Sequence, residues 1–229
     1  MIKISTKFPD AIGSADYYNP IGAIQDNHSN SAYLGELKRL AGSDKFSYLD
    51  LACAGGQSVV DVYELGNIAC GVEGSDLQKM LSSDRWSPTY LGGNDIKSGA
   101  KNWKKYKDIC LFKADITKEF ELINKNDEIQ LFDIITAWDF LEHPLPTQIP
   151  MTIDNIKKHL SKNGAFVCLI SKDHGAGIYH RCIRDREWWI GQFEEKGLVD
   201  VGFDFNASPR HTCSPTSGNT DMGFIFKHK

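Results

Sequence analysis

YLDLACAGGQSVVDVYELG, residues 48–66, joins an apolar strand to a loop of small residues and then to a helix. The strand ends at Leu51, and the helix begins near Gln57. Small residues let a backbone approach a ligand closely, and the first turn of a helix presents free N–H groups. The segment therefore indicates a strand–loop–helix unit with a ligand at the loop.

Short apolar runs alternate with amphipathic segments on both sides of this unit, over residues 44–205. Continuous apolar strands between helices are typical of a parallel sheet that is covered on both faces. The predicted fold is α/β, a three-layer sandwich around a mostly parallel, seven-stranded sheet. The run at 222–228 is expected to be its antiparallel last strand, beside 199–205. The expected strands are 46–52, 68–73, 109–113, 131–137, 165–171 and 199–205, and the expected helices are 31–40, 57–65, 149–160 and 185–196.

Glycines are expected to end the last three of these helices. Gly66 follows the first of them, the Asn163–Gly164 pair the second, and Gly197 the third. A glycine just past a helix can adopt the left-handed conformation that closes the last turn, which is why it works as a stop signal.

Length and charge limit the classes of protein to consider. The chain has 229 residues, a size that fits one compact domain and leaves little room for two. Its 26 basic and 30 acidic residues give a formal net charge of −4, which argues against non-specific binding to nucleic acid by bulk charge. No apolar run approaches the roughly 18–20 residues that span a bilayer, and no apolar signal-peptide stretch is visible. These features favour a cytoplasmic protein without membrane association.

The six cysteines form no CxxC pair, so the sequence gives no support for a zinc ribbon. Cys53, Cys70, Cys110 and Cys168 lie in or beside apolar runs. We expect them to be reduced thiols that pack as small hydrophobic side chains.

An acidic residue lies at the tip of the second predicted strand, which ends in GVEGSD. Glu73 comes 18 residues after Gly55. A carboxylate at that strand end can accept hydrogen bonds from both hydroxyls of a ribose. A small-residue turn combined with an acidic strand tip at this spacing indicates a nucleotide-containing ligand.

The loop itself, ACAGG at residues 52–56, departs from the GxGxxG of dinucleotide-binding folds. Asp50 precedes it, and an acidic residue there suits the cationic end of a ligand better than a pyrophosphate. The segment resembles motif I of class I S-adenosylmethionine (SAM)-dependent methyltransferases, DxGxGxG, with Ala52 and Ala54 in place of the first two glycines. Alanine is tolerable only where φ stays negative, a condition on the loop geometry that glycine does not impose.

Further segments resemble the same family in the order in which its motifs occur. They are FKADITKEF (112–120), LFDIITAWDFLEHP (131–144), LSKNGAFVCLIS (160–171) and REWWIGQFEEKGL (186–198). The resemblance implies a Rossmann-like SAM-dependent methyltransferase domain over residues 44–229, with residues 1–43 as an N-terminal lid or helical segment. It also implies SAM as the cofactor, with Asp115 at the adenine amino group and the Ile116 backbone facing the ring. The cofactor-binding residues implied are Asp50, Ala52, Ala54, Gly55, Glu73, Asp115, Ile116 and Trp138, with a plain core position as the alternative for Trp138.

Asp139, Glu142 and His143 form a D-x-x-E-H pattern directly after the fourth predicted strand. If Asp139 opens a helical turn, the three side chains share one face and offer ligands for a divalent ion. The pattern resembles the E-x-x-E-H of small-RNA 2′-O-methyltransferases and of ubiquinone-pathway O-methyltransferases. In the former, the resemblance implies Mg²⁺ or a similar ion, completed by a histidine after the fifth strand. His180 matches that position better than His174.

Two kinds of chemistry remain open for these residues. A bound ion would hold two neighbouring hydroxyls and lower the pKa of one, which predicts a vicinal diol or catechol acceptor. Without a metal, His143 or His180 would act alone as the general base, or Glu142 and His143 would merely cap and pack the turn. We predict His143, Asp139 and His180 as catalytic residues, and Asp139, Glu142, His143 and His180 as the metal ligands.

A lysine-rich stretch at 97–113 carries Trp103 and Tyr106 among its basic residues. Such a mixture can bind RNA or a phosphorylated sugar, but a solvated helix face is the favoured interpretation. Two polar segments, 16–30 and 206–221, are candidate lids, because loops at the carboxyl edge of a parallel sheet usually carry specificity.

Three functions follow as hypotheses. The first is a SAM-dependent O-methyltransferase that acts on a small hydroxylated acceptor, with a sugar, a nucleotide sugar or another vicinal diol favoured. The second is RNA 2′-O-methylation, which the D-x-x-E-H pattern favours and the net charge disfavours. The third is a non-catalytic SAM-binding regulatory protein, which the two alanines of the loop fit and the D-x-x-E-H residues do not.

Overall fold

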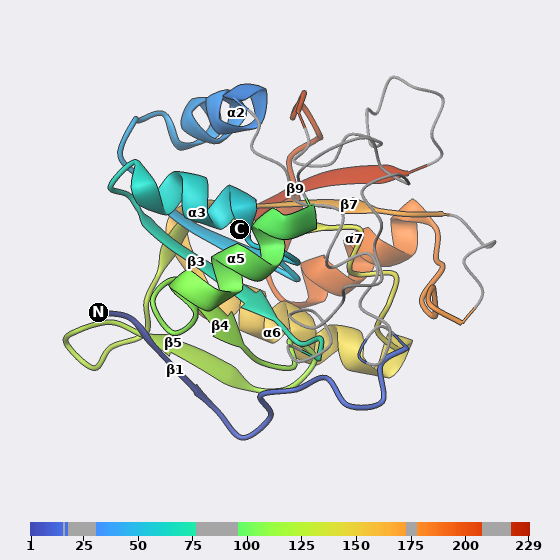
Figure 1. The fold of residues 1–229 in the computed structure, drawn as a ribbon. Coiled ribbons are helices and arrows are strands. Elements are labelled where there is room, and N and C mark those ends of the chain that lie inside the picture. Colours follow the sequence, from blue (N-terminus) through green and yellow to red (C-terminus); the bar gives the residue numbers. More distant parts are fainter. Residues whose placement is uncertain (16, 18–30, 77–95, 173–177, 208–220) are drawn as a thin grey trace.

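The computed structural model describes residues 1–15, 17, 31–76, 96–172, 178–207 and 221–229 (Figure 1). Its seven-stranded sheet consists of β4 (Leu111–Lys113), β3 (Ile68–Glu73), β2 (Ser47–Leu51), β6 (Phe132–Trp138), β7 (Leu160–Ile170), β9 (Met222–His228) and β8 (Leu198–Asp200), in that spatial order. Neighbours from β4 to β7 are parallel, and β9 runs antiparallel to both β7 and β8. The predicted sheet, with its antiparallel last strand, is confirmed.

Helices cover both faces of this sheet and complete the predicted three layers. They are α2 (Ser31–Ala41), α3 (Gln57–Glu64), α5 (Ile96–Tyr106), α6 (Ile149–His159) and α7 (Arg186–Glu195), with a 3₁₀ turn, η1 (Pro146–Gln148), before α6. The first three pack on one face around a core that includes Val59 and Trp103 (Figure 1). The last two pack on the other face around Ile153 and Trp189. Within the described ranges, no helix has the length and hydrophobicity that crossing a membrane requires.

A second, two-stranded sheet was not predicted. β1 (Lys3–Thr6) pairs antiparallel with β5 (Phe120–Ile123), so that Lys3 lies opposite Ile123. Ile2 and Ile4 pack against the core on the α6 side. A strand of four residues is too short for alternation to stand out, and its partner lies far along the chain, so local patterning could not reveal this pair.

The predicted end of α6 is wrong, whereas the other two glycine stops are confirmed. The helix ends at His159, before the Asn163–Gly164 pair, because Leu160 already pairs with β6 in the sheet. Gly66 and Gly197 do follow α3 and α7, and their φ values are 76° and 78°. These positive values lie in the region that favours glycine.

The predicted strand at 199–205 is also too long. β8 stops at Asp200, and the chain then turns toward α2. Phe205 is buried there against Tyr33 and Trp138, with ring centroids 5.8 and 5.7 Å away. Burial of this aromatic ring against α2 replaces the strand pairing that its apolar neighbours suggested.

The cysteine prediction is confirmed. Cys53, Cys70, Cys110 and Cys168 are buried free thiols, and so is Cys182. Burial in the apolar core raises the pKa of each of these thiols, which keeps them protonated and unreactive.

A buried histidine ties the small sheet to α6 and makes stability depend on pH. His159 Nε2 accepts a hydrogen bond from the Leu122 N–H at 3.0 Å, and Nδ1 donates to the Asn155 carbonyl at 2.8 Å. Burial lowers the pKa of His159 to about 4. Because its pKa in the unfolded chain is about 6.5, the unfolded state binds the extra proton between these values, and stability falls as pH falls.

We therefore expect His159→Gln to remove part of the acid sensitivity. In urea unfolding, the stability advantage of the wild type over this variant should be about 2–3 kcal/mol smaller at pH 4.5 than at pH 7.5. Parallel stability curves for the two proteins across this range would contradict the assignment.

Candidate functional site

The carboxyl ends of β3, β2 and β6 lie side by side at one edge of the sheet. Leu51, the last residue of β2, pairs with Val72 of β3 and with Ala137 of β6. The chain leaves β2 toward β3 on one side and returns as β6 on the other. Open α/β sheets bind ligands in the crevice at such a reversal of strand order. The loop 52–56 after β2 therefore lies at the expected binding edge.

The two alanines of this loop do not meet the condition of negative φ. Ala52 has a φ of 57°, Ala54 a φ of 52° and Gly56 a φ of 74°. The loop thus keeps the left-handed turns that a glycine-rich motif would adopt, although two of the glycines are alanines. A left-handed alanine costs roughly 1–2 kcal/mol. Such a conformation persists only where surrounding contacts impose it.

Contacts from two other elements hold the loop in this conformation. The Ala54 N–H donates to Glu73 Oε2 at 3.0 Å, and the Ala54 carbonyl accepts from Trp103 Nε1 at 2.8 Å. The Gly55 carbonyl accepts from Asn102 Nδ2 at 3.2 Å. Trp103 and Asn102 belong to α5, so this helix and β3 fix the loop from both sides. Neither contact from α5 could be predicted from the sequence, because no local pattern connects this helix to a loop so far away.

We expect Gly56→Ala to be strongly destabilising. A Cβ at this position would lie 2.6 Å from Leu111 Cδ2, and the φ of 74° adds strain. The expected loss of unfolding free energy is about 1–3 kcal/mol. Gly35→Ala is the matched control, since Gly35 is in the middle of α2 with open space around it. It should stabilise the protein by about 0.5–1 kcal/mol in the same urea titration.

Glu73 occupies the tip of β3, where the sequence predicted it. Its side chain is buried, with Oε2 on the Ala54 N–H and Oε1 accepting from the Ser75 N–H and hydroxyl at 2.9 and 2.8 Å. The carboxylate is therefore oriented from both sides. Among the described residues Oε2 accepts one hydrogen bond, and a carboxylate oxygen can accept two. This geometry leaves it able to accept a ligand hydroxyl as well.

Asp115 and Ile116 lie beyond the end of β4. Asp115 Oδ1 accepts from the Thr117 N–H and hydroxyl at 2.9 and 2.7 Å, which closes an Asx turn. The Asp115 N–H donates to the carbonyl of Phe8 at 2.8 Å. The Ile116 carbonyl accepts from Asn155 Nδ2 of α6 at 2.9 Å. The segment around Phe8 therefore lies against this strand end, which the sequence did not predict.

Asp50 and Trp138, the remaining predicted cofactor residues, are both buried. Asp50 Oδ1 accepts a hydrogen bond from the Thr136 hydroxyl at 2.7 Å. Trp138 Nε1 donates to the Tyr33 hydroxyl at 3.0 Å. Trp138 thus packs in the core between β6 and α2 while also marking the carboxyl end of β6.

The D-x-x-E-H residues do not lie on a helix, so the helical turn considered for Asp139, Glu142 and His143 does not form. Asp139 has a φ of 45°, which turns the chain sharply after β6. Glu142, His143 and His180 instead form one cluster, with potential ligand atoms all within 4.8 Å of one another. The rings of His143 and His180 are 5.0 Å apart in an edge-on arrangement. Asp139 is not part of this cluster.

Backbone hydrogen bonds bring His180 to the other two residues. The N–H groups of Arg181 and Cys182 donate to the Glu142 carbonyl at 2.8 and 2.9 Å. Arg181 Nε donates to the His143 carbonyl at 2.8 Å. The segment after β7 is thereby docked on the turn after β6. Because this pairing is non-local, the spacing of residues in the sequence could not place His180 here. Only the family resemblance suggested it.

Glu142 has an unusual environment for a carboxyl group. It is fully buried, Oε1 accepts from the Ser171 N–H at 3.2 Å, and Oε2 accepts no hydrogen bond within the described part of the chain. Burial raises its pKa to about 8, against the opposing effect of His143. A buried carboxyl oxygen without a donor, next to two imidazoles, is a suitable place for a cation.

The lysine-rich stretch has its aromatic residues inside the protein. Trp103 and Tyr106 of α5 are buried in the core, whereas Lys101, Lys104 and Lys105 are exposed. The solvated helix face is therefore the better interpretation. Neither of these two buried rings of α5 is available to stack on a base or a sugar. His174 and nearly all of the candidate lids at 16–30 and 206–221 lie outside the described residues.

Neither a protein-family model nor a curated protein sequence matches this chain. Solved structures do resemble it. A TehB-like SAM-dependent methyltransferase from Corynebacterium glutamicum ATCC 13032 Kitasato is 15% identical, with 94% of this chain and 96% of that chain covered and a TM-score of 0.53. The 1,6-didemethyltoxoflavin-N1-methyltransferase of Burkholderia thailandensis, solved with 1,6-didemethyltoxoflavin and S-adenosylhomocysteine, is 14% identical, with coverages of 93% and 84% and a TM-score of 0.55.

A third similar structure, described as a pericyclic reaction enzyme, is 10% identical, with coverages of 90% and 50% and a TM-score of 0.55. Identities this low show a shared fold and nothing more about chemistry. The chain therefore has the Rossmann-like fold of class I SAM-dependent methyltransferases, as predicted. Its reaction has to be argued from its own site residues.

Proposed function

We propose that this protein transfers a methyl group from SAM to a hydroxyl of a small acceptor, with a sugar, a nucleotide sugar or another vicinal diol favoured. The observation that carries the proposal is the cluster of Glu142, His143 and His180. Glu142 and His143 follow β6, and His180 follows β7, at the same sheet edge as the loop 52–56 and Glu73. A cofactor pocket and a set of acid–base groups at one edge are what methyl transfer to a hydroxyl requires.

The cofactor half of the proposal assigns one part of SAM to each strand end. Glu73 would accept the ribose hydroxyls, and Asp50 would face the cationic amino-acid end beside the loop 52–56. Asp115 and the Ile116 backbone would hold adenine, and Trp138 would flank the pocket. The buried, pre-oriented Glu73 carboxylate supports this arrangement, because it needs little reorganisation on binding.

The acceptor half rests on two half-buried imidazoles. SAM supplies an activated methyl group, so the chain has to align the acceptor oxygen and take up its proton. His143 and His180 face each other edge-on, so an acceptor hydroxyl that reaches one imidazole lies close to the other. In the absence of a metal, one of them acts as the general base.

A divalent cation is the second way in which this cluster would act. Glu142 Oε2 and one nitrogen each from His143 and His180 would hold it, and when bound it would lower the pKa of a coordinated acceptor hydroxyl. The donor set fits a cation, since Oε2 is buried without a donor among the described residues. Two imidazoles with one carboxylate suit Mn²⁺, Co²⁺ or Zn²⁺ better than Mg²⁺.

The decisive experiment combines binding and transfer. Calorimetric titration of S-adenosylhomocysteine should give micromolar binding, and labelled SAM should then methylate a vicinal diol or catechol in preference to an otherwise equal mono-alcohol. A matched amine acceptor belongs in the same assay, because a protein of this fold methylates nitrogen. Preference for the amine, or label retained by RNA, would replace the proposed acceptor class. If S-adenosylhomocysteine does not bind, the proposed function is wrong, because the reaction requires this cofactor site.

A further inference from the structure

We infer that Tyr33 of α2 is a positioning residue for the cofactor pocket, acting through a buried chain of hydroxyl groups that ends on Asp50. The inference rests on the proposed function, since it concerns how that pocket holds the amino-acid end of SAM. This hydrogen-bonded chain joins three elements that are distant in the sequence: α2, β2 and β6, which ends at Trp138.

The chain of hydroxyl groups consists of four consecutive hydrogen bonds. Trp138 Nε1 lies 3.0 Å from the Tyr33 hydroxyl, which lies 2.9 Å from the Tyr48 hydroxyl. The Tyr48 hydroxyl lies 2.9 Å from Thr136 Oγ1, and Thr136 Oγ1 lies 2.7 Å from Asp50 Oδ1. All five side chains are buried.

The chemistry of the two ends gives every hydrogen bond one direction. An indole N–H can only donate, and an ionised carboxylate can only accept. Because Thr136 donates its one proton to Asp50, Tyr48 must donate to Thr136, and Tyr33 must then donate to Tyr48. The Tyr33 hydroxyl also lies 3.5 Å from Thr136 Oγ1, a longer contact in the same direction. Burial and the nearby Asp50 raise the pKa of both phenols above the usual value for tyrosine, so both protons are retained. Every proton in the chain therefore points toward the Asp50 carboxylate.

Such a chain costs more to bury than an apolar contact of the same shape, so its presence points to a role beyond packing. A buried polar group is tolerated only if its hydrogen bonds are made, and linked hydrogen bonds strengthen one another. The docking of α2 does not depend on this chain alone. Leu37 of the same helix is also buried, and the ring of Tyr33 packs against that of Phe205.

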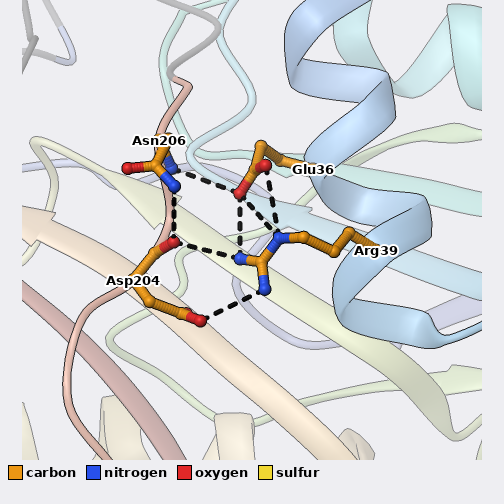
Figure 2. Close-up of polar contacts among 4 residues, drawn as sticks. All are labelled: Glu36, Arg39, Asp204 and Asn206. Carbon is orange, nitrogen blue, oxygen red and sulfur yellow. Dashed lines mark hydrogen bonds and ion pairs between the residues drawn. The ribbon is translucent and has the colours of Figure 1, made fainter.

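A separate surface clamp also holds α2 in place (Figure 2). Arg39 bonds Glu36 Oε2 at 2.9 Å within the helix and Asp204 Oδ2 at 3.1 Å on the segment after β8. Glu36 Oε2 also accepts from the Asn206 N–H at 3.2 Å. The hydroxyl chain and the clamp both fasten α2, but only the chain reaches Asp50 and Trp138. This difference allows the two to be tested separately.

The consequence is selective for one end of the cofactor. Asp50 would face the cationic amino-acid end, whereas Glu73 and Asp115 would hold the ribose and adenine. Loss of the Tyr33 hydroxyl removes a donor from Tyr48 and the acceptor of Trp138, and it leaves the hydrogen bonds that orient Glu73 and Asp115 in place. A general loosening of α2 would instead affect all ligands alike.

The test compares S-adenosylhomocysteine with 5′-methylthioadenosine, which lacks the amino-acid end. For Tyr33→Phe we expect the Kd of S-adenosylhomocysteine to rise about 10-fold and that of 5′-methylthioadenosine to change less than about 2-fold. Thr136→Val, which cuts the same chain next to Asp50, should give the same selective loss if Tyr33→Phe does not fold. Thr136→Ser keeps a hydroxyl and should restore binding of S-adenosylhomocysteine.

Arg39→Met is the matched control, because it breaks the clamp and leaves every member of the chain intact. It should leave the ratio of the two dissociation constants unchanged. Equal weakening of both ligands by Tyr33→Phe, or the same selective loss in Arg39→Met, would overturn the inference while the proposed function stands. If the wild type binds neither ligand, the proposed function fails and the inference fails with it.

Discussion

Replacing Glu73 with alanine is expected to weaken binding of S-adenosylhomocysteine roughly 100-fold or more, about 2.7 kcal/mol. The carboxylate accepts hydrogen bonds from Ala54 and Ser75, and in the proposed complex it also accepts the ribose hydroxyls. Hydrogen bonds to a charged group contribute about 1.5–3 kcal/mol each. Loss of the bond to Ala54 also releases the left-handed loop, so the ligand would have to reorganise it on binding.

Calorimetric titration at matched folded fractions measures this effect. Glu195→Ala is the control, because Glu195 is exposed at the end of α7, far from the binding edge. It should leave the Kd within about 2-fold. Glu73→Gln keeps one acceptor oxygen and should lie between the wild type and Glu73→Ala. A folded Glu73→Ala protein with an unchanged Kd would show that β3 does not hold the cofactor.

At least one of His143→Asn and His180→Asn is expected to lower kcat by about 10²–10⁴-fold, while both leave the Kd of S-adenosylhomocysteine within about 2-fold. Both imidazoles lie in the cluster with Glu142, on the proposed acceptor side of the site. In the proposed mechanism, removing either one takes away a proton acceptor or a metal ligand and leaves unchanged the strand ends that would hold the cofactor. Transfer of labelled methyl groups to the preferred acceptor measures kcat directly.

The pair of variants also separates the two mechanisms proposed for the cluster. If a cation is held by three ligands, both variants and Glu142→Gln should lose activity together, and Mn²⁺ binding should disappear in each. If one histidine acts as a metal-free base, only one variant should lose activity, and a chelator should have no effect on the wild type. His228→Asn serves as the control, since His228 contacts the Leu160 carbonyl at the far end of β9. Full activity in both cluster variants would contradict any acceptor role for the cluster.

Much of the fold could be predicted because its signals are local. β3 has the predicted bounds, and β2 and α3 differ from them by one or two residues. Their apolar runs and glycine stops act within a few positions, so periodicity and turn chemistry are enough to place them. The antiparallel final strand also followed from its apolar run and its position after the last helix.

The errors occur where a distant contact overrode a local signal. The left-handed Ala52 and Ala54 conflict with the conformational preference of alanine, and contacts from β3 and α5 impose them. The D-x-x-E-H spacing suggested a helical face, but Asp139 turns the chain, and His180 takes the place beside Glu142 and His143.

The sequence by itself determined the α/β alternation, the order of the strand-end motifs and the residue types available at each strand end. These properties depend on side-chain period and on glycine, which act over a single turn or strand. Only the tertiary structure decided that Glu142, His143 and His180 form one cluster and that a chain of hydroxyls links Tyr33 to Asp50. Both depend on hydrogen bonds and close contacts between residues far apart in the chain, and these distances exist only once the sheet has brought its strand ends together.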